Sequence, residues 1–301
     1  MGHIITDLKE TFRRGNIFIQ LIYINVSIFI IGTLINVFLQ LFQHSIPDIF
    51  GIFALPASFI RFFHQPWSII TYMFMHAGLL HILFNMLWLY WFGSLFLHFF
   101  SAKHLRGLYI LGGILGGLLY MVAYNVFPLF NQEVAVSTLV GASASVLAIV
   151  AATAYREPNY RVQLFLFGAI RLKYLALVVI GIDVLSITSS NAGGHIAHLG
   201  GALAGLWFAA SLSKGTDLTS WINWILDGFI SLFQKKTWKR KPKMKVHYGN
   251  SATGREKDYD YNAQKKAQSD EVDRILEKLK KSGYDSLTTE EKKSLFDASK
   301  R

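Results

Sequence analysis

Six long apolar stretches constrain the fold of this chain more than any other feature of its sequence. A helix needs roughly 20 predominantly apolar residues to cross a bilayer, where lipid-exposed backbone must satisfy its hydrogen bonds internally. Stretches of this kind lie at about residues 18–42, 77–99, 105–127, 137–155, 163–187 and 193–212. The first is too long for the apolar region of a signal peptide, and no A-x-A cleavage motif follows it, so we expect it to be retained. The sequence predicts an all-α membrane protein with six transmembrane helices.

Charge is concentrated at the C-terminal end of the chain. Charged residues make up 16% of the sequence, against about 25% in ordinary soluble domains. Residues 1–212 hold ten Lys or Arg and six Asp or Glu, whereas residues 213–301 hold twenty and thirteen. An apolar block followed by a charged tail excludes a soluble globular enzyme. The sequence has no Cys, which excludes a disulfide-built secreted domain and a thiolate metal or iron–sulfur site.

Basic residues gather at alternate ends of the apolar stretches and thereby orient them, because Lys and Arg accumulate on the cytoplasmic side of membrane proteins. They precede the first stretch, follow the second and the fourth, and follow the sixth as a run over residues 235–245. The connections on the opposite side carry only Arg61, Asp48 and Glu133. We therefore expect a multi-pass integral membrane protein with both termini in the cytoplasm, in the plasma (inner) membrane if the protein is bacterial.

The first external connection, residues 43–76, is unusually apolar for a loop. Its aromatic residues are Phe50, Phe53, Phe59, Phe62, Phe63 and Trp67, together with Tyr72 and Phe74. The segment is too short for a further pair of spans. It is compatible with an amphipathic element lying in the membrane interface and equally with an aromatic belt that anchors the protein.

The tail divides into a membrane-proximal part and a helical part. Residues 221–233 resemble a short helix on the membrane surface, and the basic run 235–245 would bind anionic lipid at about 1 kcal/mol per charge; nucleic-acid binding is disfavoured. A helix is expected over residues 270–281, and Thr288 with Glu291 forms a capping box for a second helix. The expected organisation is a cytoplasmic N-terminal segment (1–17), a six-span domain (18–212), an interfacial helix with basic run and linker (213–262), and a small cytoplasmic helical hairpin (263–301) that docks a cytoplasmic partner.

Polar side chains within the apolar stretches are candidates for function, because they are costly at membrane depth. The second stretch carries His76, His81 and Asn85, the fourth Ser143 and Ser145, the fifth Asp183, and the sixth His195 and His198. Ser143 lies about six residues into its stretch and His198 about five into its own, which at a rise of about 1.5 Å per residue puts both roughly 8–10 Å below the external end. His81 is expected at a similar depth, with Asn85 one turn deeper.

These residues suggest nucleophilic catalysis. Small residues at steps of four in the sixth stretch (Ala197, Gly201, Gly205, Ala209) would let it pack closely on a small face of the fourth (Gly141, Ser145, Ala148, Ala152). Ser143 could then meet His198, which would take the hydroxyl proton and return it to the leaving amine. Asn85, His81 and the Ser143 backbone N–H could bind the oxyanion.

Two other interpretations of the polar residues remain open. A metal site could use His76, His81, His195 and His198, although no acidic residue accompanies them at the spacing of zinc proteases. Structural polar packing is the other, and for Ser145 we expect a hydrogen bond back to a carbonyl one turn earlier.

Three motifs in this order resemble those of the rhomboid family of intramembrane serine proteases. They are HAGLLHILFN at residues 76–85, GAS at 141–143, and AHLGGALAG at 197–205, within a resemblance that covers residues 18–212. The resemblance implies a six-transmembrane-helix rhomboid bundle that acts as a serine endopeptidase without a cofactor. It implies that Ser143 is the nucleophile and His198 the general base, that Asn85, His81 and the Ser143 amide form the oxyanion hole, and that His76 supports the loop above.

The resemblance also implies the substrate class: a membrane-spanning helix, unwound near its outer end and entering beside the fifth span, with a small residue on the N-terminal side of the cut. His195 is the rival base, ranked second because no Gly-Gly pair follows it. Asp183 has no role in the family dyad; packing is favoured for it over orienting a histidine. The chain departs from the family at Ala144, where many members have Gly, and at Ser68, where an Arg commonly follows the Trp.

Two different functions compete with the protease. One is a catalytically silent rhomboid-like protein that binds membrane helices, which the intact Ser143, His198 and Asn85 argue against. The other is a histidine-based, metal-dependent membrane hydrolase. A tail that recruits a cytoplasmic partner is compatible with each of them.

Overall fold

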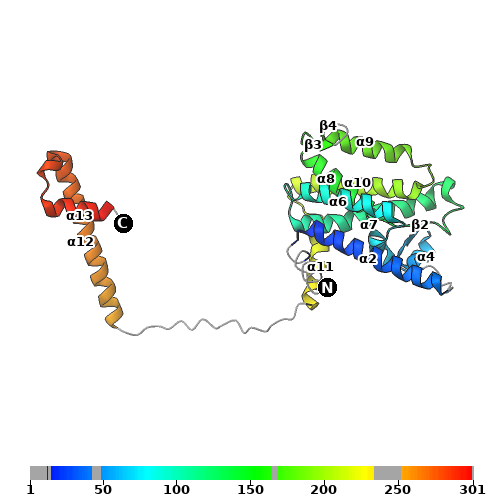
Figure 1. Ribbon diagram of the computed structural model, residues 1–301, viewed down its shortest axis with the longest axis horizontal. Helices are drawn as coiled ribbons and strands as arrows, with labels where there is room; N and C mark the ends of the chain where they lie inside the picture. Colours follow the sequence, from blue (N-terminus) through cyan, green and yellow to red (C-terminus); the bar gives the residue numbers. More distant parts are fainter. Residues whose placement is uncertain (1–11, 13–14, 43–48, 165–167, 234–251, 300–301) are drawn as a thin grey trace. The chain divides into compact units, whose positions relative to one another are not determined.

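The computed structural model describes residue 12 and residues 15–42, 49–164, 168–233 and 252–299. These residues form two compact units, divided between residues 235 and 236. Most of the expected N-terminal segment 1–17 and the basic run 235–245 lie outside the described residues. The first unit contains the helices that carry the candidate site (Figure 1).

In the described part of the first unit, six helices correspond to the six apolar stretches, but only four of these helices are long and apolar enough to cross a membrane. The four are α2 (Ile17–Leu41), α6 (Leu79–Phe96), α7 (Ala102–Val126) and α10 (Ala192–Ser213). The other two, α8 (Ser143–Arg156) and α9 (Leu172–Leu185), have 14 residues each. Fourteen residues span about 21 Å, which is less than the roughly 30 Å of a hydrocarbon core. The expected count of six full spans is therefore not confirmed.

The two short helices begin later than their apolar stretches because strands precede them. Residues 137–142 were expected to be helical, but strand β2 (Thr138–Leu139) pairs with β1 (Leu55–Pro56), and Gly141 has a φ of 131° that no helix accommodates. Before α9, strands β3 (Arg161–Leu164) and β4 (Gly168–Arg171) pair antiparallel. Both corrections concern the ends of the spans and leave their order unchanged.

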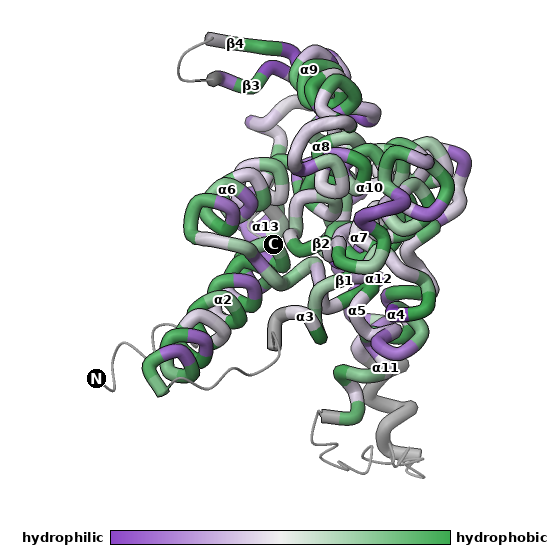
Figure 2. Tube along the Cα trace, turned by 90° about the vertical axis from the view of Figure 1, so that its right-hand side faces the viewer, coloured by the Kyte–Doolittle hydropathy of each residue, from purple (hydrophilic) through white to green (hydrophobic). Residues whose placement is uncertain are grey.

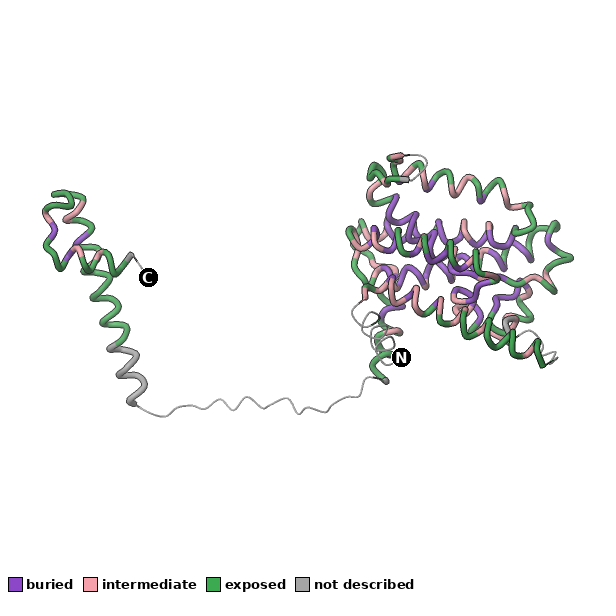
Figure 3. The backbone as a smooth tube through the Cα atoms, viewed as in Figure 1, coloured by how far each residue is buried: buried purple, intermediate pink, exposed green. Residues whose placement is uncertain are grey.

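The core of the first unit lies where α7, α8 and α10 pack together, as the buried segments in Figure 3 show. Glycines on α10 permit the contact with α8: a Cβ atom on Gly201 would lie 2.1 Å from the carbonyl oxygen of Ala144, and one on Gly205 would lie 2.1 Å from that of Ala148. Such distances leave room only for hydrogen atoms. The small-residue contact predicted between these two helices is therefore present.

Several helices of the first unit consist largely of apolar residues (Figure 2), and many of these residues are exposed. On α2, Leu34 and Leu41 are 63% and 76% exposed, and on α9, Leu177 and Leu185 are 64% and 85% exposed. Soluble monomers rarely expose continuous apolar surface of this kind. The exposed faces fit a protein surrounded by lipid.

The first connection folds into short elements rather than one amphipathic helix. They are α3 (Ile49–Phe53), β1, α4 (Phe59–His64), α5 (Ser68–Thr71) and the 3-10 turn η1 (Tyr72–Phe74). Hydrogen bonds hold them together: Gln65 Nε2 donates to the carbonyl of Ala54 at 3.1 Å, and Trp67 Nε1 donates to that of Ile52 at 3.0 Å. The connection is thus anchored although Ser68 replaces the family's usual arginine.

Helix α11 (Ser220–Phe233) follows α10 and is fastened to α7 by its polar face. Arg106 Nε and Nη2 donate to Asn223 Oδ1 at 2.9 and 2.8 Å, and Nη2 also donates to Asp227 Oδ1 at 2.7 Å. Its apolar side chains divide between two faces: Ile222 is buried in the core, whereas Trp224 is 78% exposed. The helix expected at residues 221–233 is present, and its membrane-surface position stays a prediction.

The second unit consists of α12 (Ala252–Ser282), the 3-10 turn η3 (Tyr284–Ser286) and α13 (Thr289–Ser299). Thr288 and Glu291 form the expected capping box, since Thr288 N–H donates to Glu291 Oε2 at 2.9 Å and Glu291 N–H donates to Thr288 Oγ1 at 3.3 Å. Helix α12 begins within the expected linker. Apolar periodicity starts only near Val272, whereas the preceding residues are polar helix formers that such periodicity does not reveal.

Candidate active site

Three helices bring four of the five predicted site residues, all but His76, to one cavity of about 400 Å³. Helix α6 contributes His81 and Asn85, α8 contributes Ser143, and α10 contributes His198. The cavity wall is otherwise largely apolar: Leu80, Phe84, Trp88, Val140, Val146, Leu147 and Val179, with Asn191 and Gly194. A concave, mainly apolar pocket with a few convergent polar groups is the usual form of a binding or active site.

Ser143 is the first residue of α8, not a residue six positions inside a helix. The helical rise from which its depth was calculated therefore does not apply to this residue, because residues 137–142 are not helical. The position has a chemical consequence: the N–H groups of a helix's first turn have no acceptor within the helix. The Ser143 backbone N–H is consequently available beside its own hydroxyl.

The turn before Ser143 requires glycine at position 141. Its φ of 131° disfavours any residue with a Cβ atom, and its N–H donates to the carbonyl of Tyr72 at 2.9 Å. A Cβ atom here would lie 2.8 Å from His81 Nε2 and 3.6 Å from Ser143 Oγ. His81 Nε2 and Ser143 Oγ therefore lie on the same side of this glycine and close to it.

The predicted residues of α6 and the loop before it form a connected group. The His76 and His81 rings stand edge to face with centroids 5.2 Å apart, and His76 is buried. Ala77 N–H donates to His81 Nδ1 at 3.4 Å, which leaves the proton of a neutral His81 on Nε2. Asn85, one turn further along α6, donates through Nδ2 to the His81 carbonyl at 2.8 Å.

Ser145 does not behave as expected. Its hydroxyl is fully buried and has no hydrogen-bond partner among the described residues, so the predicted bond to a carbonyl one turn earlier is absent. Ser145 packs against α7 at Gly112 and is not among the residues lining the cavity. Of these two serines, only Ser143 is in a position to meet a substrate.

Asp183 contacts both histidines of α10, which the sequence did not identify as its partners. Its Oδ1 atom accepts a hydrogen bond from Nδ1–H of His195 and another from Nδ1–H of His198, each at 2.8 Å. Asp183 is 3% exposed, on the last turn of α9, whereas both histidines come from α10. A hydrogen-bonded packing role was favoured for Asp183 over the role of orienting a histidine, and Asp183 is bonded both to His198 and to the rival base His195. His195, unlike His198, does not line the cavity.

The residues that could share a metal ion differ from the predicted set. Within the described part of the chain, Asp183, His195 and His198 have potential ligand atoms within 4.8 Å of one another, whereas His76 and His81 are not members of this group. The separations of 2.8 Å between carboxylate oxygen and ring nitrogen are those of direct hydrogen bonds.

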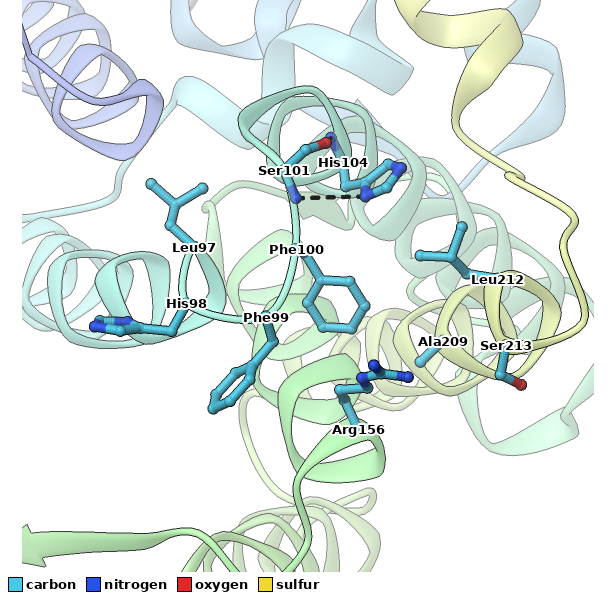
Figure 4. A pocket seen from close by; sticks show the side chains of 10 residues that line it. All are labelled: Leu97, His98, Phe99, Phe100, Ser101, His104, Arg156, Ala209, Leu212 and Ser213. Atoms are coloured by element: carbon cyan, nitrogen blue, oxygen red, sulfur yellow. Dashed lines mark hydrogen bonds between the residues drawn. The ribbon is translucent and has the colours of Figure 1, made fainter. Parts of the chain in front are cut away.

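A second cavity, of about 480 Å³, lies at the other ends of α6 and α10 (Figure 4). Its polar groups are already engaged or lack a reactive partner: Ser101 N–H donates to His104 Nδ1 at 3.5 Å, and Ser213 Oγ donates to the carbonyl of Ala210 at 2.7 Å. Arg156 points into this cavity beside Phe100 (Figure 4). The arrangement offers no serine paired with a histidine base among the residues that line it, so the first cavity is the candidate active site.

Comparison with known proteins adds two family matches and two relatives. The model of the Rhomboid domain matches residues 64–215, and that of a family of unknown function (DUF6576) matches residues 255–301. The chain is 29% identical over 157 residues to RHOMBOID-like protein 12, mitochondrial, of Arabidopsis thaliana, covering 49% of this chain and 47% of the relative. It is 30% identical over 139 residues to Presenilin-associated rhomboid-like protein A, mitochondrial, of Danio rerio, covering 45% of this chain and 34% of the relative. The chain thus spans less than half the length of each relative.

Proposed function

Because this chain belongs to the rhomboid family, we propose that it is an intramembrane serine endopeptidase with Ser143 as nucleophile and His198 as general base. One observation carries the proposal: Ser143, His198, His81 and Asn85, drawn from three helices, line a single cavity. Rhomboid membership and apolar helices support the coarser statement that this is a multi-pass membrane protein of a family whose members are typically proteases.

The hydrogen bonds of His198 and His81 match the roles that each would have in acyl transfer. His198 donates through Nδ1, so its Nε2 carries the lone pair that accepts the hydroxyl proton as Ser143 Oγ attacks the scissile carbonyl. His81 accepts at Nδ1, so its Nε2–H can donate to the developing oxyanion together with the Ser143 N–H and Asn85. His198 then returns the proton to the leaving amine as the C–N bond breaks, and water hydrolyses the acyl-enzyme ester.

The walls of the cavity support a membrane-spanning helix as the substrate. Apolar side chains from α6, α8 and α9 surround the polar group, and Val179 brings α9 to the cavity's edge. An apolar segment that is locally unwound would bury its side chains against this wall while exposing one peptide bond to Ser143. We further propose that the substrate helix enters beside α9 and carries a small residue on the N-terminal side of the cleaved bond.

Membrane placement and partners belong to the same proposal. Both termini would lie in the cytoplasm, since basic residues flank that side, with the plasma (inner) membrane as the location in a bacterial source. Helix α11 would lie on the membrane surface through Trp221 and Trp224, and the run 235–245 would bind anionic lipid. The unit at 252–299 would dock a cytoplasmic partner.

Cleavage of a reporter with a helix-breaking transmembrane segment tests the proposal. The full chain is reconstituted in vesicles, and wild type is compared with Ser143→Ala, His198→Ala and the matched control Ser145→Ala. We expect no cleavage by Ser143→Ala, a loss of at least about 100-fold in His198→Ala, and near-normal cleavage by Ser145→Ala. Cleavage that survives Ser143→Ala, or that a chelator abolishes in wild type, would overturn the proposal. Capture of an uncleaved reporter by wild type would instead indicate a catalytically silent relative.

A further inference from the structure

A single carboxylate oxygen connects the two histidines at the candidate active site. Asp183 Oδ1 lies 2.8 Å from the Nδ1 atoms of His195 and of His198, while its Oδ2 atom has no hydrogen-bond partner among the described residues. The neighbours of Asp183 on the last turn of α9, Ile182 and Val184, are 55% and 51% exposed. Asp183 is therefore the side chain by which this turn of α9 reaches α10.

The bond to Asp183 decides which nitrogen of His198 can act as a base. A neutral imidazole carries one proton, and the nitrogen without it is the acceptor. With the proton held on Nδ1 by the carboxylate, the lone pair stays on Nε2, and the ring cannot turn without breaking a bond to a charged acceptor. An aspartate that orients its histidine in this way is a known device of serine hydrolases on other folds.

The second bond, from His195, acts on Asp183 itself. A carboxylate with one hydrogen bond can rotate about its side-chain torsions, whereas two donors from the same helix, three residues apart, fix the position of Oδ1. The burial of Asp183 raises the cost of leaving it unpaired, since water does not replace a lost donor. If Asp183 served packing alone, it would not need to bond to His198, which lines the cavity, or to accept both hydrogen bonds at Oδ1.

We propose that Asp183 is a positioning residue that holds His198 in the tautomer and orientation of a general base, and that His195 holds Asp183 in place. The site would then act through a Ser143–His198–Asp183 triad instead of a Ser143–His198 dyad, with His195 fixing the position of Asp183. This inference rests on the proposed protease function, and the experiment below separates the failure of one from the failure of the other.

The test compares Asp183→Asn and His195→Gln with Asp227→Asn, a matched loss of a carboxylate on α11. Each full-length variant is reconstituted in vesicles, and three quantities are measured: kcat, KM, and the rate at which a fluorophosphonate labels Ser143. The label reports activation of the nucleophile without requiring a substrate helix to enter. We expect Asp183→Asn to lower kcat and labelling about 10- to 100-fold at an unchanged KM. His195→Gln keeps an amide donor and should lose less than about 10-fold, and Asp227→Asn should resemble wild type.

A spectroscopic measurement on the wild-type protein makes the test independent of whether Asp183→Asn and His195→Gln fold. In ¹⁵N-histidine-labelled protein, His198, assigned by its loss in His198→Gln, should be protonated at Nδ1 and unprotonated at Nε2. The opposite tautomer would overturn the inference, as would Asp183→Asn with kcat and labelling within about twofold of wild type. Stoichiometric zinc that Asp183→Asn removes would also overturn it, by identifying the three residues as metal ligands. Absence of labelling at Ser143 in wild type would instead refute the proposed function.

Discussion

The close packing of α10 on α8 predicts that one methyl group at Gly201 will impair catalysis. A Cβ atom at this position would lie 2.1 Å from the carbonyl oxygen of Ala144, whereas an ordinary contact is at least 3.4 Å. The obstacle is backbone, so no side chain can rotate away. The two helices must therefore separate by about 1 Å, which is the scale of misplacement that costs on the order of 100-fold in rate.

The same substitution has a calculable effect on stability. Overpacking of a tight core costs typically about 1–3 kcal/mol, while alanine gains about 1 kcal/mol over glycine in a helix interior. We therefore expect Gly201→Ala to lose about 0–2 kcal/mol of unfolding free energy. Gly205→Ala meets the carbonyl of Ala148 at the same 2.1 Å and should be destabilised equally. Its contact lies one turn further from Ser143, so its loss of kcat should be smaller.

Reporter cleavage in vesicles and thermal unfolding in detergent measure the two effects separately. Gly181→Ala is the matched control, because Gly181 lies inside α9 and a Cβ atom there would meet nothing within 4 Å. The control should unfold at the same or a higher temperature and cleave normally. If Gly201→Ala keeps kcat within about threefold of wild type, α8 and α10 do not need this contact to align Ser143 with His198, and the reasoning is refuted.

Two further predictions concern the rest of the chain. Arg106→Ala should destabilise the first unit by about 1–2 kcal/mol and raise hydrogen exchange in α11, because it removes the hydrogen bonds of Arg106 to that helix. The control Lys103→Ala removes a more exposed ion pair and should change stability by less than about 0.5 kcal/mol. Equal effects of the two substitutions would refute the prediction. The Lys278 ammonium and the Thr288 N–H lower the pKa of Glu291 to about 2, so its stabilising effect on α12 and α13 should be present above about pH 4.5 and lost as the pH falls from 4.5 toward 2. Hydrogen exchange of residues 252–299 should show this loss in wild type, and Glu291→Gln should remove that part of the pH dependence while Glu277→Gln does not.

The sequence was informative about class and motifs but less so about where helices begin. Apolar composition alone does not distinguish a helix from a buried loop or a short hairpin. For this reason residues 137–142, 163–164 and 168–171 were expected within spans, although the first group holds β2 and the turn at Gly141 and the others belong to strands β3 and β4. The error mattered at Ser143, whose place at a helix start supplies a free backbone N–H that a position inside the helix would not have.

Sequence patterns did not predict hydrogen bonds between side chains that lie on different helices. Asp183 lies 12 and 15 residues before the two histidines it accepts from, and an intervening turn separates α9 from α10. Neither helical spacing nor composition predicts which side chain a carboxylate on one helix meets on the next. For Ser145 the local rule of bonding to the preceding turn failed, because Ser145 is the third residue of α8 and Gly141, four residues earlier, is not helical.

The sequence by itself determined the apolar helices, the rhomboid motifs and the glycines that allow helices to touch, because these depend on residue type and on spacing along one helix. The motif ranked His198 above His195, and the tertiary structure agrees, since only His198 lines the cavity. Only the tertiary structure decided that Asp183 bonds to both. Those outcomes depend on the rotation of α9 and α10 about their axes. That rotation is fixed by the sum of many contacts across the bundle, not by any one stretch of residues.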